Sequence, residues 1–385
     1  MLSEFTFNLP TRIEYGNGFL YKAGDIAKEF KAKKVMIVTD KGIRATPLFD
    51  EVESVIKKAG ISVVVFDDVK PNPKDDDCQA GGLLAIQENV DTIIALGGGS
   101  SMDSAKAVCS LVTNQGPIAN IMKPNKLKNE PIPLICIPTT AGTGSEVTSF
   151  AVITINALKM KSCIFDEKVR PKVSINDPSV LMGLPSHIAA ATGIDALTHA
   201  IEAYTCNYAT QITDAYAIAA IKLISANLRN LVYAKDNQSC DAMMMGSLMA
   251  GIAFGFSDVA GVHCLAEALG GLYDTPHGVA NSIFLPVMFE YNIPADVKKH
   301  AEVSMAMGLS TIGKSERELA EAGAEVLRVL AKDLSIPKLK DLGYVNPNDF
   351  QKMSEVCMRN VSAKSNPRLV SAEIFKELFE VTYGL

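Results

Sequence analysis

The 385-residue sequence lacks tryptophan and long apolar runs, and it contains only five histidines. Its eight cysteines are scattered without a Cys-x-x-Cys pair, which excludes a zinc ribbon and is typical of buried thiols in a reducing compartment. No stretch approaches the roughly 18 apolar residues that a membrane-spanning helix needs. The first residues show no basic flank followed by an apolar segment, so we expect no signal peptide and a cytoplasmic location.

An excess of positive charge is also missing. Lysine and arginine total 37 against 43 aspartate and glutamate residues, giving a formal net charge of −6. A nucleic-acid groove needs clustered basic side chains that displace counterions from phosphates. The basic run at Lys31, Lys33 and Lys34 is short and precedes an apolar strand, so it indicates a solvated element end. We therefore expect a small-molecule ligand, with neither nucleic acid nor membrane as a partner.

The first half of the chain alternates short apolar runs with segments of helical period. Alternation of strands with long crossovers favours a parallel sheet covered by helices on both faces. Residues 150–177 contain a different pattern, which indicates short strands or a hairpin. The predicted strands are 34–40, 61–69, 92–100 and 131–140, and the intervening helices are 47–58, 75–89 and 101–112.

After Pro178 the sequence becomes rich in alanine and methionine, with long segments of helical period and almost no strand-like runs. We predict an α/β domain over 1–179 and an all-helical domain over 180–385. No low-complexity linker separates them, so the two domains are expected to pack closely over a cleft. Ligand sites favour such clefts and the carboxyl ends of parallel strands.

Three consecutive glycines, Gly97, Gly98 and Gly99, followed by Ser100, lie between a predicted strand and a predicted helix. Glycines let the backbone approach a diphosphate closely, and the following helix offers unpaired N–H groups to the anion. A tight strand–helix turn is the alternative, although it would need only one or two glycines. The segment is not the ordinary G-x-G-x-x-G dinucleotide motif.

A loop rich in hydroxyls, residues 138–146, follows the last predicted strand and opens at the same edge of the sheet. Its side chains suit hydrogen bonds to ribose and phosphate, but Thr143 or Ser145 could equally cap a helix. Asp40 ends the first predicted strand. Its carboxylate suits an adenosine ribose and would repel a 2′-phosphate, favouring NAD over NADP, while an ordinary turn aspartate is the alternative.

A second group of polar residues lies in the helical half. Asp195 and His199 are four residues apart on a predicted helix and share one face. His263 and His277 follow in glycine-punctuated apolar segments. A simple Asp–His hydrogen bond and ordinary core histidines remain alternatives. Three imidazoles and one carboxylate suit Fe²⁺, Zn²⁺, Mn²⁺ or Co²⁺.

Several segments together resemble the iron-dependent (group III) alcohol dehydrogenases, which include lactaldehyde reductases, 1,3-propanediol dehydrogenases and butanol dehydrogenases. The segments are GGGSSMDSAKA, PTTAGTGSEVT, INDP, ATGIDALTHAIEAY and PHGVANSIFLP. The resemblance spans nearly the whole chain. It implies a Rossmann-like N-terminal domain for the dinucleotide and an all-α domain for metal and substrate, an architecture shared with dehydroquinate synthases. It also implies hydride transfer between a short primary alcohol or diol, or its aldehyde, and NAD(H), in a homodimer or larger oligomer.

The resemblance also assigns roles to residues. It implies Asp195, His199, His263 and His277 as ligands of Fe²⁺, with Zn²⁺ or another divalent ion as alternatives. It implies NAD as the cofactor, with NADP as the less favoured alternative. The positions matching cofactor contacts are Asp40, Asn72, Gly98, Gly99, Ser100, Asp103, Thr139, Thr140, Thr143, Ser145 and Lys161.

Two departures from the family pattern concern the substrate side. Relatives often have a second histidine where this chain has Glu267, one helical turn after His263. We predict a catalytic role for Glu267 beside His263 and His277, as a proton relay or polar recognition group, with an exposed helix charge or salt bridge as the alternative. The second departure is the segment containing Phe254, Phe256 and Asp258, which we expect to reshape the substrate pocket.

Three other functions remain open at this point. A zinc enzyme similar to glycerol dehydrogenase is expected to show three metal ligands rather than four. A lyase similar to dehydroquinate synthase is expected to have fewer histidines and a cluster of Lys and Arg for a charged substrate, which this segment lacks. A binding protein that has lost its chemistry would not need an intact ligand set.

Overall fold

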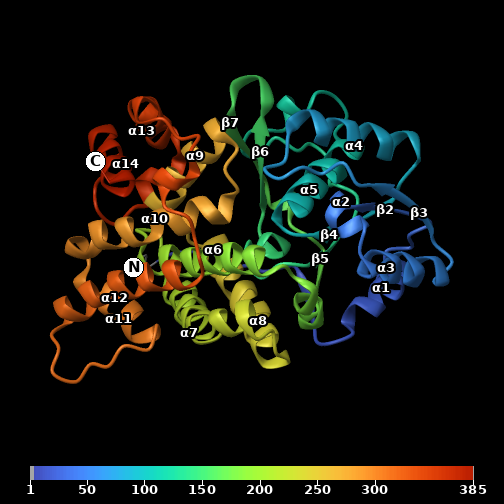
Figure 1. Ribbon diagram of the computed structural model, residues 1–385. Helices are drawn as coiled ribbons and strands as arrows, with labels where there is room; N and C mark the ends of the chain where they lie inside the picture. Colours follow the sequence, from blue (N-terminus) through green and yellow to red (C-terminus); the bar gives the residue numbers. More distant parts are fainter. Residues whose placement is uncertain (1–3, 385) are drawn as a thin grey trace. The chain divides into compact units, whose positions relative to one another are not determined.

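The computed structural model of the protein describes residues 4–384 (Figure 1). The chain forms two compact units. The N-terminal unit comprises Asn8–Thr140 and Ser145–Leu184, and the helical unit comprises residues 4–7, Ala141–Gly144 and residues 185–384. The division after Leu184 falls a few residues beyond the boundary predicted from sequence. The sequence pattern also gave no sign that the short loop Ala141–Gly144 belongs with the helices.

A six-stranded parallel sheet in the order β1-β8-β5-β4-β2-β3 forms the centre of the N-terminal unit. The prediction of a parallel α/β fold is therefore confirmed. A separate antiparallel hairpin pairs β6 with β7. The strands are β1 (Arg12–Tyr15), β2 (Lys34–Val38), β3 (Ser62–Phe66), β4 (Thr92–Gly97), β5 (Leu134–Pro138), β6 (Phe150–Ile155), β7 (Met160–Phe165) and β8 (Val173–Asn176).

Four of these strands lie within the runs predicted from sequence, and the hairpin lies in the region where one was expected. The edge strand β1 was missed. Its sequence, Arg-Ile-Glu-Tyr, has a single aliphatic residue and none of its side chains is fully buried, so it carries no strand signal. It is ordered by pairing with β8, whose residues are all buried.

Helices cover both faces of the sheet. Alternate residues of each strand point to opposite sides, so apolar side chains on both faces need helices to pack against. On β2, Val35 and Ile37 pack with residues of α1 and α3, whereas Met36 and Val38 pack with residues of α4 and α5. The helices of this unit are α1 (Ala23–Glu29), α2 (Lys41–Arg44), α3 (Pro47–Lys58), α4 (Asp75–Gln87) and α5 (Gly99–Thr113).

The carboxyl ends of β2, β4 and β5 lie side by side, since these strands are neighbours in the sheet. Asp40 follows β2, Gly98 follows β4, and Thr139 follows β5. Residues distant in sequence are thereby collected at one edge of the sheet, where α/β folds bind ligands.

The described part of the helical unit contains α-helices and short 3₁₀ turns but no strand, which confirms the predicted all-α character. Helices α6, α7 and α8 pack against one another, and α10 packs against both α6 and α9. The helices are α6 (Ser186–Thr205), α7 (Gln211–Tyr233), α8 (Asn237–Gly255), α9 (Gly261–Tyr273), α10 (His277–Asn292), α11 (Val297–Ala306), α12 (Glu316–Asp333), α13 (Phe350–Arg359) and α14 (Ala372–Tyr383).

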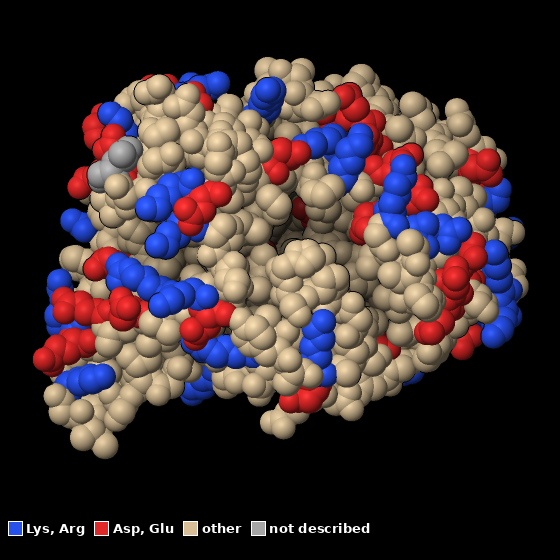
Figure 2. All heavy atoms as spheres, viewed as in Figure 1, with Lys and Arg blue, Asp and Glu red and all other residues tan. Residues whose placement is uncertain are grey.

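Two surface properties bear on possible partners. Among residues 4–384, no helix has the combination of length and apolar character that a bilayer span requires. On the face drawn in Figure 2, lysine and arginine side chains are interspersed with aspartate and glutamate rather than gathered into a basic patch. The mixed charge agrees with the composition, in which acidic residues outnumber basic ones.

Candidate functional site

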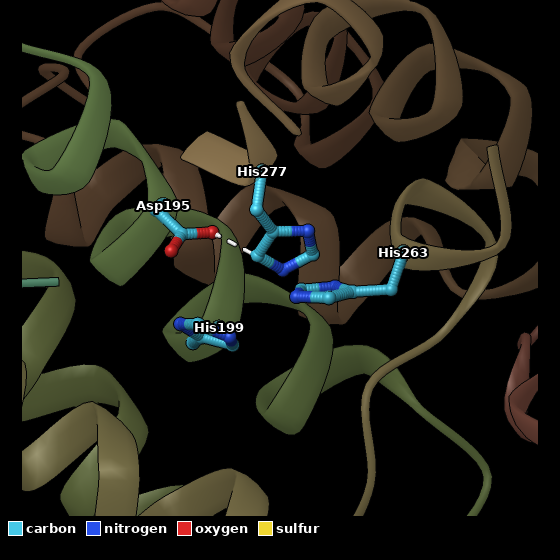
Figure 3. Close-up of side chains that lie close together, drawn as sticks. All are labelled: Asp195, His199, His263 and His277. Carbon is cyan, nitrogen blue, oxygen red and sulfur yellow. Dashed lines mark ion pairs between the residues drawn. The ribbon is translucent and has the colours of Figure 1, made fainter. Parts of the chain in front are cut away.

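Four side chains from three helices converge in the helical unit (Figure 3). Asp195 and His199 project from α6, His263 from α9, and His277 is the first residue of α10. One ligand atom from each lies within 4.8 Å of the other three. Asp195, His199 and His263 are almost completely buried, while His277 is partly exposed. The fold thus brings together all four residues singled out from the sequence.

Two of the imidazole rings are oriented by hydrogen bonds on their outer nitrogens. Nδ1 of His199 lies 3.1 Å from the carbonyl oxygen of Gly142, and Nδ1 of His263 lies 2.6 Å from Oε2 of Glu202. A proton on Nδ1 leaves the lone pair of Nε2 for a metal ion. Burial lowers the pKa of His199 to about 4, so its ring is neutral at pH 7, which is the form that coordinates a metal.

Glu202 was missed in the sequence, although it lies on α6, three residues after His199. Besides His263, its carboxylate accepts hydrogen bonds from the backbone N–H groups of Ala260 at 2.9 Å and Val262 at 2.7 Å. Burial raises the pKa of Glu202 to about 7, while these backbone hydrogen bonds oppose the shift. An acidic residue on the ligand-bearing face of an apolar helix was the available signal.

Asn281 was also missed, although it lies one helical turn after His277 on α10. Its Nδ2 donates to Oδ1 of Asp195 at 2.6 Å and lies 3.2 Å from Nε2 of His263 and 3.1 Å from Nε2 of His277. A single amide nitrogen can approach three ligand atoms only if their lone pairs converge on one small region. This convergence, with one carboxylate and three imidazoles, fits a divalent transition-metal ion.

Glycines allow the close backbone packing on which the site depends. A Cβ on Gly142 would lie 2.7 Å from Cβ of Thr192 on α6. A Cβ on Gly278, next to His277, would lie 2.7 Å from the carbonyl oxygen of Ala191. Both contacts are too close for any side chain, so glycine is required where the loop and the start of α10 meet α6.

The glycine turn of the N-terminal unit joins β4 to α5 as predicted. Gly97 has φ of +153°, and a Cβ there would collide with the side chain of Ser101. A Cβ on Gly98 would lie 3.2 Å from Oγ1 of Thr140. The absence of a side chain at Gly98 thus lets Thr140 pack closely against the turn, and α5 begins at Gly99 without a side-chain cap at its N-terminus.

Asp40 lies at the end of β2 and caps the short helix α2. Its Oδ1 accepts hydrogen bonds from the N–H groups of Gly42 at 2.8 Å and Ile43 at 3.0 Å. The other oxygen, Oδ2, faces Gly97, where a Cβ would lie 3.6 Å from it. One carboxylate oxygen thus has the turn role considered as an alternative, and the other points toward the glycine turn.

Asp103 and Ser145, both predicted to contact a cofactor, hydrogen-bond to each other. The Ser145 hydroxyl donates to Oδ1 of Asp103 at 2.7 Å, and Lys106 Nζ donates to the Ser145 hydroxyl at 2.8 Å. Oδ2 of Asp103 accepts from the backbone N–H of Val152 at 2.9 Å. These contacts join Ser145 and strand β6 to helix α5.

The remaining predicted cofactor positions lie in both units. Asn72 is buried after β3 with φ of +51°, and Lys161 lies partly buried on β7. Ser100 lies in the first turn of α5 and is partly buried. Thr143 is partly buried in the loop Ala141–Gly144 of the helical unit.

The residues expected on the substrate side have different surroundings. Phe254 stacks on His199, with ring centroids 4.2 Å apart, whereas Phe256 contacts Phe7. Asp258 accepts hydrogen bonds from Ser362 and Ser365 in the 3₁₀ turn η10 (Val361–Ser365). Phe254 is therefore in direct contact with one of the four converging side chains. Glu267 is partly buried and accepts a hydrogen bond from Nδ2 of Asn360 at 2.7 Å.

Comparison with known proteins agrees with this geometry. The family model of iron-containing alcohol dehydrogenases matches residues 10–178, and the model of the C-terminal region of the same family matches residues 189–383. The chain belongs to the iron-containing alcohol dehydrogenase family. The resemblance stated from the sequence motifs is therefore confirmed.

Individual relatives of this alcohol dehydrogenase match over almost their whole length. This chain is 40% identical to a 1,3-propanediol dehydrogenase of Citrobacter freundii, and the alignment covers 97% of this chain and 99% of the relative. It is 36% identical to an NAD-dependent methanol dehydrogenase of Bacillus methanolicus, covering 97% and 98%. A crystal structure of a 1,3-propanediol oxidoreductase superposes with a TM-score of 0.95 at 38% identity, covering 98% and 100%. These matches favour an alcohol dehydrogenase over the glycerol-dehydrogenase-like and dehydroquinate-synthase-like alternatives.

Proposed function

We propose that the protein transfers a hydride between a short primary alcohol or diol, or the corresponding aldehyde, and NAD(H). The observation that supports this most directly is the convergence of Asp195, His199, His263 and His277 in a chain of the iron-containing family. The similarity to a propanediol dehydrogenase and an NAD-dependent methanol dehydrogenase supports the substrate and cofactor classes.

We propose that these four side chains hold Fe²⁺, with Zn²⁺ or another divalent ion as the alternative. When bound, the cation polarises the substrate oxygen, which makes an alcohol more acidic and an aldehyde carbonyl more electrophilic. The chain itself supplies the ligand positions. The carbonyl of Gly142 orients the His199 ring, and Phe254 packs against the same ring.

The proposed NAD site uses the carboxyl edge of the parallel sheet. The N-terminus of α5, with Gly98, Gly99 and Ser100, would hold the diphosphate, and Asp40 would accept hydrogen bonds from the adenosine ribose. Asp103 and Ser145, which hydrogen-bond to each other, would also line the cofactor. The other proposed contacts are Asn72, Thr139, Thr140, Thr143 and Lys161. NAD, when bound, would supply the hydride acceptor, and the part of the chain would be to position it against the substrate and to exclude water.

We propose that Glu267 acts as a proton relay or as a polar group that recognises the substrate. Its place one turn after His263 on α9 supports this role, as does the substitution of a carboxylate for the usual histidine. The hydrogen bond from Asn360 holds the carboxylate in one orientation. A purely structural bond between α9 and the end of α13 is the alternative.

Two further features belong to the proposal. We propose a cytoplasmic enzyme, since none of the eight cysteines, all within residues 4–384, forms a disulfide and seven of them are buried. We also propose a homodimer or larger homo-oligomer, on the basis of the family. Analytical ultracentrifugation of the purified protein tests the second point.

The proposed function is tested by metal analysis followed by anaerobic assays with a panel of alcohols, diols and aldehydes. Oxygen is excluded because a ferrous site is prone to oxidation. We expect about one divalent ion per chain and reduction of NAD in preference to NADP. Failure of the purified protein to bind Fe²⁺ or Zn²⁺ measurably would contradict the proposal. Failure to oxidise any alcohol in the panel would contradict it as well.

A further inference from the structure

We propose that Glu202 is a positioning residue that sets the imidazole of His263 and thereby prepares the cluster to receive its cation. The inference rests on the proposed metal-binding role of Asp195, His199, His263 and His277. Glu202 is not one of these four residues. It joins α6, which carries Asp195 and His199, to α9, which carries His263.

Glu202 lies on the same face of α6 as two proposed ligands. Asp195, His199 and Glu202 are spaced four and three residues apart, so their side chains emerge above one another on the helix surface. The Glu202 side chain then reaches across to α9, where Oε2 lies 2.6 Å from Nδ1 of His263. Only 3% of Glu202 is exposed, so this contact is shielded from competing water.

The same carboxylate also fixes the start of α9. The backbone N–H groups of Ala260 and Val262 donate to its two oxygens, at 2.9 Å and 2.7 Å. The intervening N–H of Gly261 donates to Oδ1 of Asn366 at 3.2 Å. The first amides of α9 therefore find acceptors on α6 and on the segment after η10. Because the helix N-terminus is positive, an acidic side chain is favoured there.

Three N–H donors, two from the backbone and one from His263, thus converge on Glu202 and favour its ionised form, which can only accept. A carboxylate satisfies all three at once. Glutamine has nearly the same shape, but in either orientation of the amide its NH₂ group would face a backbone N–H, that of Val262 or that of Ala260, and leave a buried donor without an acceptor. Glu202→Gln therefore changes the hydrogen-bond pattern with little change in volume.

The consequence for the cluster lies in which nitrogen of His263 carries the proton. With Nδ1–H donated to Glu202, Nε2 keeps its lone pair and faces Asp195, His277 and Asn281. The opposite tautomer would place an N–H bond where the cation binds. Outer carboxylates of this kind commonly contribute about 10–100-fold to metal affinity.

The first experiment compares Co²⁺ binding by the wild-type protein and the Glu202→Gln variant. Affinity is measured by competition with a chromophoric chelator, and the geometry by the visible absorption of bound Co²⁺. Thr205→Val is the matched control, because Thr205 is buried on the same helix and its hydroxyl bonds only the Ile201 carbonyl of its own helix. We expect Glu202→Gln to weaken Co²⁺ binding about 10–100-fold and to alter the absorption bands, with Thr205→Val close to wild type.

The second experiment needs no variant at position 202 and remains informative if Glu202→Gln does not fold. The protein has five histidines, so the His263 signals in ¹⁵N-histidine NMR of the metal-free wild-type protein can be assigned by comparison with single substitutions of the other four, His187, His199, His277 and His300. We expect His263 as the Nδ1–H tautomer with an unprotonated Nε2. Observation of the Nε2–H tautomer at His263 would overturn the inference.

The outcomes separate the inference from the proposed function. Absence of Co²⁺ binding by the wild-type protein would contradict the metal site itself. Tight binding by wild type together with unchanged affinity and spectrum in Glu202→Gln would overturn only the role of Glu202. Equal weakening by Thr205→Val and Glu202→Gln would also overturn it, because the effect would then reflect general disturbance of α6.

Discussion

The backbone carbonyl of Gly142 lies 3.1 Å from Nδ1 of His199, so a loop far from α6 in sequence fixes one of its imidazole rings. Gly142 reaches this position because its lack of a side chain allows contact with Thr192. The loop rich in glycine and hydroxyls therefore has a function that its sequence did not indicate. It orients a proposed metal ligand by a main-chain acceptor.

This relationship predicts that Gly142→Ala weakens the metal site. The new Cβ would lie 2.7 Å from Cβ of Thr192 and 2.8 Å from its carbonyl oxygen, so the loop must move and carry its own carbonyl away from His199. We expect a loss of about 1–3 kcal/mol in stability and a lower affinity for Co²⁺. Gly183→Ala is the control, because a Cβ there meets nothing within 4 Å. Metal affinity equal in the two variants would contradict the role of the loop.

Asp195→Asn tests the one carboxylate of the cluster. The substitution keeps the size and one oxygen but removes the charge that favours a cation in a site where Asp195 is 2% exposed. We expect metal affinity to fall by more than about 100-fold, with a parallel loss of kcat. Elemental analysis and anaerobic turnover measure the two effects, with the exposed Asp341→Asn as control. Full metal content and activity in Asp195→Asn would refute the ligand assignment.

Asp40→Asn is expected to relax the preference for NAD. Asparagine caps a helix as well as aspartate does, so α2 should persist while the charge facing a 2′-phosphate disappears. We expect the ratio of kcat/KM for NADP to that for NAD to rise roughly ten-fold. An unchanged ratio in a variant of normal stability would show that Asp40 serves only as a cap.

Glu267→Gln tests the proton relay. If the carboxylate exchanges a proton during turnover, the amide variant should lose one ionisation from the pH dependence of kcat. The hydrogen bond from Asn360 should keep the side chain in place, so a merely structural residue would leave the profile as it was. Steady-state rates from acidic to alkaline pH provide the measurement, with the exposed Glu316→Gln as control.

Glu146 predicts a pH dependence of stability in the N-terminal unit. Burial raises its pKa from 4.5 to about 7, so the folded protein holds this proton over a range in which the unfolded chain has released it. Stability therefore falls as pH rises through that window, and the full cost of about 3 kcal/mol is present above pH 7. We expect Glu146→Gln to lose this decrease, so that the melting temperatures of variant and wild type diverge from pH 5 to pH 8. Parallel curves would contradict the shift.

The periodicity of the sequence predicted the strands β2 to β5 and the all-helical second half, because buried elements need continuous or periodic apolar residues. Composition alone could not predict β1, whose order depends on pairing with β8. The motifs were enough to single out Asp195, His199, His263 and His277 as candidate ligands, since polar residues in apolar helices are conspicuous, and the structure shows that these four side chains lie close together.

The sequence by itself therefore determined the fold class and the residue types available for metal chemistry. Only the tertiary structure decided which groups surround them. Glu202 hydrogen-bonds to His263, the carbonyl of Gly142 lies against His199, and Asp258 accepts a hydrogen bond from Ser362 in the turn η10. The physical reason is that hydrogen-bond partners of buried polar groups come from other elements, at sequence separations that no local pattern encodes.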